Sequence, residues 1–274
     1  MKNLTPLTRK MSYWDDIVNS KHLVSRTPLQ AIRTNVSNRF TEYIQHTNPM
    51  TLEAIPASTF VAPNIALLKG CYSNSNGLSF LKTKIKEKQN VLLRSECQYC
   101  NIGEPSTFDH YLPQVDFPEF SALSINLIPC CSPCNTVKGD HWRLHGKRTI
   151  INIYYDTLPN VPYLTCSIVY RKNVLQTDFS VNAAIIPANM RTEITNHFST
   201  LQLAERYKGR SNSEITDVFN AIQPFSAILS KLQIQNQLRN DAAKMKVSKG
   251  DNYWRAVLKI ALSNSNRFLT DAGY

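Results

Sequence analysis

The sequence predicts an α+β protein in which a short polar centre lies between mainly helical regions, with a small β-rich segment after the centre. Three observations support this fold class. Apolar residues recur with helical spacing in the first 90 residues and again after residue 190. Residues 97–140 are dense in Cys, Asp, His, Asn and Pro and have no long periodicity. Two runs rich in Ile, Val, Tyr and Thr follow them.

The first 90 residues are expected to form a mainly helical N-terminal domain. A helix start is predicted at Thr27, with Pro28 in the first helical position. Its apolar face would carry Leu29, Ile32, Val36, Phe40, Tyr43 and Ile44. Residues 49–64 contain three prolines and predict irregular structure, and residues 71–77 predict a loop. Residues 78–90, with four lysines, predict a basic surface helix that leads into the polar centre.

A second domain is expected at residues 91–148, and residues 149–274 would form a C-terminal extension of short strands followed by helices. Strands are predicted at 150–155 and 163–170, separated by a Pro/Asn turn. The apolar spacing then predicts one helix through Ile194, Phe198, Leu201 and Tyr207, a second ending near Pro224, and a last one starting near Trp254.

The net charge of the chain indicates which classes of partner it suits. Lys and Arg number 31 against 20 Asp and Glu, which gives a formal charge of +11 and suits a polyanionic partner such as nucleic acid or an anionic membrane surface. A merely basic soluble protein is equally compatible with this charge. No apolar run reaches the roughly 18 residues of a membrane span, and the N-terminus has no apolar signal segment. We therefore expect a cytoplasmic protein without a membrane partner, with reduced cysteines.

Two cysteine pairs of the form C-x2-C predict a structural metal site. Cys97 and Cys100 form the first pair, Cys131 and Cys134 the second, and 30 residues separate them. Two such pairs supply the four thiolates of a closed tetrahedral Zn²⁺ site, which leaves no position for substrate. Four buried cysteines without metal are the alternative. Cys130 has a poorer spacing to Cys134, and the remaining isolated cysteines are expected to be small buried apolar residues: Cys71 and Cys166.

The residues between and after the two pairs complete a longer pattern. Asp109-His110-x-x-Pro113 is followed by Asn126-Leu127, and the second cysteine pair runs into Asn135-x-x-Lys138-Gly139. In this order the pattern resembles the HNH, or ββα-metal, endonuclease family. The resemblance implies a zinc-stapled treble-clef core: a β-hairpin with Asp109-His110 on its first strand and residues 126–128 on its second, then a short helix from about Ser132 to Lys138.

The resemblance also implies a role for each residue in metal-dependent hydrolysis of a phosphodiester bond. His110 would be the general base for the attacking water. Asp109 and Asn135 would supply oxygen ligands to a catalytic Mg²⁺ or Mn²⁺. Asn126 would bond the backbone across the loop and hold His110 in place. Asn135 stands where the family name has its last His, which makes the set an H-N-N variant.

Phosphate contacts are expected from basic residues after the second cysteine pair: Lys138, Arg143, Lys147 and Arg148. His141 and His145 follow the predicted helix and are interpreted as surface residues with at most a phosphate contact. His110 as a satisfied core histidine, and Asn126 as a plain turn residue, are the simpler alternatives.

Two other functions compete with the enzyme. A zinc-finger-type nucleic-acid-binding module would keep the cysteines and the basic charge, but would not need Asp109, His110, Asn126 and Asn135 together. An adaptor with a decayed nuclease core is the other alternative. The sequence of residues 109–131 is similar to that of HNH nucleases from bacterial phage-defence operons (Septu-like). Such operons often also encode an ATPase partner. That similarity implies a defence effector with an ATPase partner; it leaves DNA or RNA open as substrate.

Overall fold

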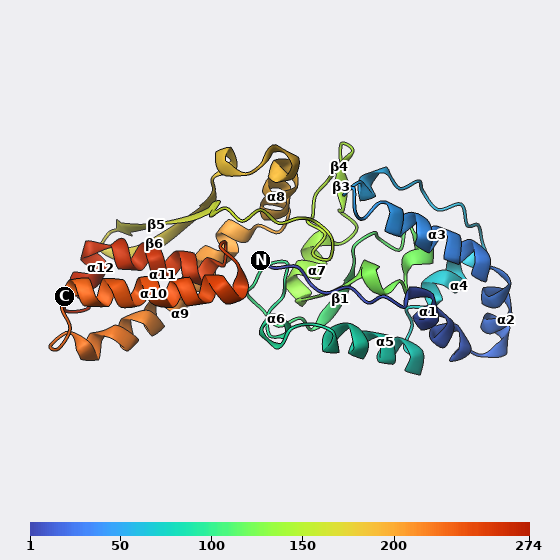
Figure 1. Cartoon of the computed structure of the whole chain (residues 1–274), viewed down its shortest axis with the longest axis horizontal. Coiled ribbons are helices and arrows are strands. Elements are labelled where there is room, and N and C mark those ends of the chain that lie inside the picture. Colours follow the sequence, from blue (N-terminus) through green and yellow to red (C-terminus); the bar gives the residue numbers. More distant parts are fainter. The chain divides into compact units, whose positions relative to one another are not determined.

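The computed structural model describes all 274 residues and divides into two compact units (Figure 1). The N-terminal unit comprises residues 3–99 and 103–157. The C-terminal unit comprises residues 158–274 together with residues 1–2 and 100–102. The N-terminal unit therefore contains most of the first two predicted domains. The protein is of mixed α and β structure with three small two-stranded sheets, in line with the predicted class.

The first half of the N-terminal unit is helical, as the apolar spacing predicts. Its helices are α1 (Lys10–Asn19), α2 (Leu23–Ala31), α3 (Arg33–Gln45), α4 (Asn64–Gly70), α5 (Asn76–Glu87) and α6 (Val91–Arg94), with a short 3-10 turn, η1 (Leu52–Ala54). The predicted helix start at Thr27 is wrong. Pro28 lies inside α2, because the first turn is already closed upstream by a hydrogen bond from the Arg26 N–H to the His22 carbonyl at 2.8 Å.

Helix α5 takes its place through a close approach to α1. A Cβ atom at Gly77 would lie 2.7 Å from the Cα of Ile17, so only glycine allows the two backbones to come this close. The side chains of Leu81 and Ile85 then bury one face of α5, and Ser75 caps its N-terminus by accepting a hydrogen bond from the Leu78 N–H. The rest of α5 is left to form one wall of the cleft described below.

The polar centre folds as the predicted hairpin and helix. Strand β1 (Thr107–His110) pairs antiparallel with β2 (Leu127–Cys130), so that His110 faces Leu127 across the ladder. Helix α7 (Ser132–Lys138) follows β2, and short 3-10 turns precede β2: η2 (Pro118–Phe120) and η3 (Ser124–Asn126). Asn126 therefore lies one residue before the strand on which it was expected. A further small hairpin, β3 (Arg143–Leu144) with β4 (Lys147–Arg148), was not predicted.

The strand predicted at 150–155 is wrong, although these residues are buried. The Asn152 N–H donates to the Asp156 carboxylate at 2.8 Å, and the Asn152 side-chain oxygen accepts from the Tyr154 N–H at 3.0 Å. Side-chain oxygens thus satisfy the backbone groups that a neighbouring strand would otherwise bond.

The C-terminal unit contains a β-hairpin and five helices. Strand β5 (Leu164–Arg171) matches the second predicted strand, and it pairs with an unpredicted β6 (Val174–Val181). The helices are α8 (Ala188–Thr200), α9 (Leu203–Ile222), α10 (Lys231–Lys249), α11 (Trp254–Asn264) and α12 (Asn266–Asp271), with 3-10 turns η4 (Ala183–Ile185) and η5 (Gln223–Phe225). The single helix predicted through Ile194 and Tyr207 is broken at Gln202, whose φ is +51°. None of the helices has both the length and the apolar character required to cross a membrane.

Candidate metal centre and catalytic cleft

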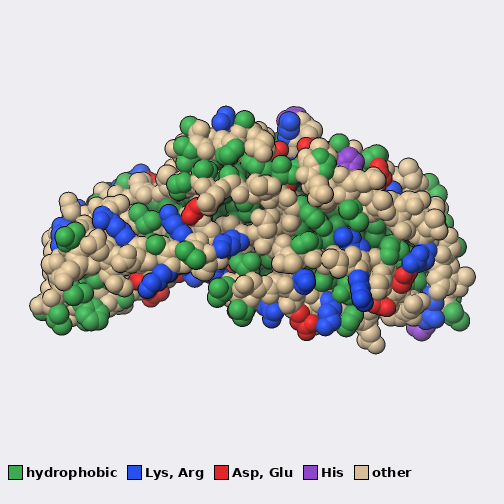
Figure 2. Space-filling model, in the orientation of Figure 1, with side chains coloured by type: hydrophobic (Ala, Val, Ile, Leu, Met, Phe, Trp, Pro, Cys, Tyr) green, Lys and Arg blue, Asp and Glu red, His purple; other side chains and the backbone are tan.

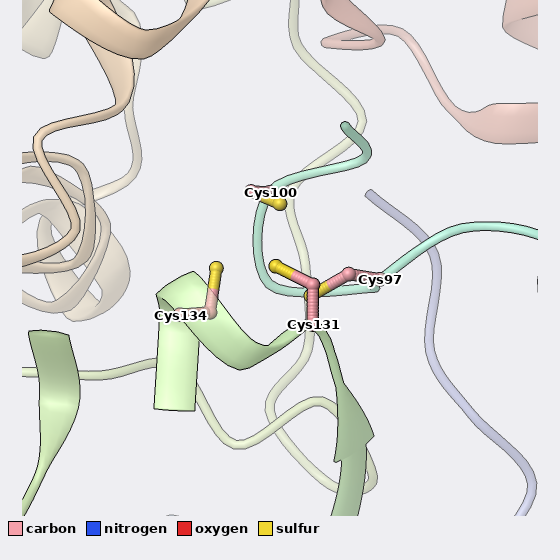
Figure 3. Close-up of side chains that lie close together, drawn as sticks. All are labelled: Cys97, Cys100, Cys131 and Cys134. Atoms are coloured by element: carbon pink, nitrogen blue, oxygen red, sulfur yellow. The ribbon is translucent and has the colours of Figure 1, made fainter. Parts of the chain in front are cut away.

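The four cysteines predicted as zinc ligands come together. Their Sγ atoms all lie within 4.8 Å of one another, all four side chains are buried, and in Figure 3 the sulfur atoms point toward a common centre. Cys131 directly precedes α7 and Cys134 lies in its first turn, while Cys97 and Cys100 lie on the loop after α6. Four convergent thiols at this spacing can hold a tetrahedral zinc ion.

Local features shape this cluster and exclude the neighbouring thiol. The Cys97 N–H donates to the Gly103 carbonyl at 2.7 Å and closes the first knuckle. A Cβ at Gly103 would lie 3.3 Å from the Cys131 Cβ, which leaves little room for any larger residue. Cys130 lies apart from the cluster: its sulfur contacts the Thr107 hydroxyl at 3.5 Å, and burial raises the pKa of its thiol to about 12.

Next to this centre lies a cleft of about 750 Å³. One wall comes from α5 and from Tyr72 before it, and the other from β1, the loop after β1, and the end of α7. Three of the predicted catalytic residues line it: Asp109, His110 and Asn135. The volume lies within the usual range for small-molecule and cofactor sites.

His110 is held in one orientation by contacts to one of its two ring nitrogens. Its Nε2 lies 2.9 Å from the Ser121 carbonyl oxygen, which can only accept, so Nε2 carries the proton. The Gln114 Nε2 also lies 2.9 Å from this nitrogen. Because two N–H donors cannot bond each other, we assign the Gln114 amide with its oxygen on this side. The Tyr72 ring packs edge-on at 4.3 Å between centroids. Burial lowers the pKa of His110 to about 4, so the ring is neutral at pH 7 and Nδ1 has a free lone pair.

Asp109 is almost fully buried, and both of its oxygens have partners. The Tyr99 hydroxyl donates to Oδ2 at 2.8 Å, and the Lys138 ammonium donates to Oδ1 at 3.0 Å. Burial raises the pKa of Asp109, and the Lys138 charge opposes this shift. A carboxylate offers about four lone-pair positions, so two donors leave room for a metal ion.

Asn135 and Asn126 have opposite environments. The Asn135 side chain is half-buried at the cleft and has no hydrogen bond to the protein, so its oxygen is available as a ligand. Asn126 is fully buried, as the predicted bonding across the loop requires. Its Oδ1 accepts from the Leu112 N–H at 2.8 Å, and its Nδ2 donates to the carbonyls of Leu112 at 3.0 Å and Phe120 at 3.2 Å.

Two of the four predicted phosphate contacts need correction. Lys138 is fully buried, and its ammonium bonds Asp109 and the His110 carbonyl at 2.7 Å, so it supports the carboxylate from behind. Arg148 is also buried and donates to both oxygens of Asp156 at 2.7 Å. Neither cation is exposed to a polyanion. Arg143 and Lys147 are exposed on the β3–β4 hairpin and stay as predicted candidates.

The cleft also contains residues that the sequence did not point to as site residues. They are Tyr72, Lys82, Lys86, Gln114 and Asp140. The only sequence signal for the lysines was the basic character of residues 78–90, which does not reveal which of them face the cleft. The side of α5 that faces β1 is set by packing between segments distant in sequence.

Comparisons with known proteins leave the family open. No family model matches the chain, and no solved structure matches it. A relative is protein ea31 of Escherichia phage lambda, which is 28% identical over 195 residues. The match covers 63% of this chain and 63% of the phage protein, so the chain spans less than two thirds of that relative.

Proposed function

We propose that the protein is a metal-dependent endonuclease of the HNH type, which hydrolyses phosphodiester bonds in nucleic acid. One observation carries the proposal: Asp109, His110 and Asn135 line a single cleft. A neutral imidazole with a free nitrogen, beside a carboxylate and an amide oxygen, is the donor set that hydrolysis of a phosphate ester needs. The β-hairpin and helix that carry these residues, next to four convergent cysteines, are the arrangement that the family resemblance implies.

His110 acts as the general base. Its Nδ1 takes a proton from the water that attacks phosphorus, while the Ser121 carbonyl keeps the ring from turning. Asn126 bonds the backbone of Leu112 and Phe120. These two residues lie close in sequence to His110 and Ser121. The general base is thus positioned by backbone that is itself fixed by a buried amide.

Asp109 and Asn135 would hold a Mg²⁺ or Mn²⁺ ion. Both side chains offer the hard oxygen donors that these ions prefer, and the Asn135 amide is free to bind. When bound, the ion neutralises charge on the phosphate and helps the 3′-oxygen leave. Tyr99 and Lys138 orient the Asp109 carboxylate through hydrogen bonds. The cysteine cluster would hold zinc as a scaffold and take no part in the chemistry.

The test compares wild type with His110→Ala on plasmid DNA, single-stranded DNA and total RNA, with and without Mn²⁺. His22→Ala is the matched control, because His22 is exposed, makes no capping hydrogen bond and does not line the cleft. We expect cleavage of one of the substrates by wild type and by the control in Mn²⁺, and no cleavage detectable on the same time scale by His110→Ala. Equal cleavage by all three proteins would remove His110 as base. Binding without any cleavage would favour a zinc-stabilised binding module.

A role in defence against phage, with an ATPase partner, is part of the same proposal. Its support is the similarity of residues 109–131 to nucleases of such operons. Co-purification of the chain with the products of its neighbouring genes tests it, and the absence of an ATPase among them would count against it.

A further inference from the structure

The wall of the cleft opposite the catalytic residues contains a pair of lysines that the proposed chemistry does not use. Lys82 and Lys86 lie four residues apart on α5 and both line the cleft. Side chains with this spacing share one face of a helix, with about 5–6 Å between their Cβ atoms. Figure 2 shows Lys and Arg side chains over the part of the surface that α5 occupies. The two lysines thus bring a double positive charge to the space in front of His110.

Neither ammonium has a carboxylate partner within the protein, whereas Lys84 on the same helix pairs with Glu87 at 2.7 Å. Aromatic rings hold the two lysines instead. The Lys82 Nζ lies 4.2 Å from the centre of the Tyr72 ring, and the Lys86 Nζ lies 5.6 Å from that of Phe108. Cation–π contacts of this kind orient a lysine without neutralising it.

Two like charges side by side in a partly enclosed space repel each other unless an anion joins them. The pKa of Lys82 is lowered by burial and then by the charge of Lys86, which is the expected sign of that repulsion. An anion between the lysines would relieve it. The two carboxylates that also line the cleft are Asp109, which is paired with Lys138, and Asp140.

The size of the cleft favours a single strand as the ligand. Its volume of about 750 Å³ is that of a small-ligand site, and α5 closes one side of it. The Cβ spacing of about 5–6 Å is similar to the distance between neighbouring phosphates along one backbone, so two lysines four residues apart can reach consecutive phosphates. Basic grooves lined with aromatic side chains are typical of proteins that bind single strands.

We propose that Lys82 and Lys86 bind consecutive backbone phosphates of a single-stranded substrate beside the bond that is cut. The identity of the ligand as nucleic acid rests on the proposed function. The two lysines set the position of the strand and, because they contact only phosphate, add no sequence preference.

The test measures binding by the full chain with the His110→Ala substitution, in buffer without added divalent ions. The probe is a fluorescent 12-nucleotide single strand, compared with the same sequence as a duplex. The cleft variant is Lys82→Gln/Lys86→Gln. The matched control is Lys84→Gln/Lys88→Gln, which removes the same charge from other positions of the same helix and its end. Lys82→Arg/Lys86→Arg is the conservative variant, and circular dichroism checks that each protein is folded.

The cleft variant should bind the single strand about tenfold more weakly or worse at low salt. Its slope of log K against log salt should fall by about 1.4, because each phosphate contact on a single strand contributes about 0.7. The control should keep the slope, the arginine variant should retain binding, and the duplex should bind more weakly. Equal losses in cleft and control variants, no binding by the parent protein, or equally tight, lysine-dependent binding of the duplex would each overturn the proposal.

The binding data and the cleavage assay of His110→Ala together separate this inference from the proposed nuclease activity. Lysine-dependent binding together with unchanged cleavage by His110→Ala would leave the phosphate site standing and remove the catalytic assignment. Cleavage that requires His110, together with binding that does not depend on the two lysines, would support the catalytic assignment and remove the phosphate site.

Discussion

Replacing Lys138 with methionine should destabilise the N-terminal unit strongly, because the structure makes this lysine an internal support. Its side chain is 0% exposed and that of its partner Asp109 is 3% exposed. The ammonium also donates to the His110 carbonyl at 2.7 Å. Removing one partner of a buried ion pair costs about 3–5 kcal/mol, because the remaining charge is left uncompensated. Two lost hydrogen bonds to or from a charged group, at about 1.5–3 kcal/mol each, give a similar sum.

Urea unfolding of the zinc-loaded protein measures this effect. With a denaturant slope of about 2 kcal/mol per M, the midpoint of the N-terminal unit should fall by roughly 1.5–2.5 M. Lys147→Met is the control, since Lys147 is exposed and has no ion pair. Adding Asp109→Asn to Lys138→Met should recover part of the loss, because no buried charge then lacks a partner. If Lys138→Met alone unfolds at the wild-type midpoint, the buried-pair account is refuted and Lys138 is again a candidate phosphate contact.

Three further variants test the loop and the zinc cluster. Asn126→Ala should lower the free energy of unfolding in urea by about 2–4 kcal/mol, because it leaves buried backbone groups without partners. The control Asn38→Ala, on the exposed face of α3, should change the free energy of unfolding little. Equal midpoints for the two variants would contradict the role assigned to Asn126. Cys134→Ser should lose zinc by metal analysis while Cys130→Ser keeps it, and the reverse would show that the wrong cysteine was assigned. Gly103→Ala should weaken zinc binding by about tenfold or more in a chelator titration, because the added Cβ would crowd Cys131. Zinc binding with wild-type affinity would show that the loop between Cys97 and Gly103 can move to accommodate the methyl group.

The parts of the fold that could be predicted are those specified by local sequence. The cysteine spacing and the residues around 109, 126 and 135 located β1, β2 and α7 closely. Helix α10 was missed because its buried residues form a narrow stripe on an otherwise polar helix: Ile234, Leu238 and Ala242. Residues 150–155 have strand-like composition, but Asn152 and Asp156 bond the backbone locally.

The site divides in the same way. Asp109, His110 and Asn135 belong to one motif, and their common cleft could be expected from it. The sequence does not show which carboxylate each cation pairs with. Lys138 is 29 residues from Asp109, and Arg148 reaches both Asp156 and Glu53. A lysine or arginine after a zinc site looks the same in sequence whether it faces solvent or a buried carboxylate.

The central claim is that His110 removes a proton from water in this cleft. Single-turnover cleavage of a labelled single strand in Mn²⁺ tests it most directly, with wild type, His110→Ala, and His110→Ala supplied with imidazole. General-base catalysis contributes about 10²–10⁴-fold, so the variant should be slower by that factor and imidazole should restore part of the rate. Cleavage by His110→Ala at the wild-type rate would contradict the account.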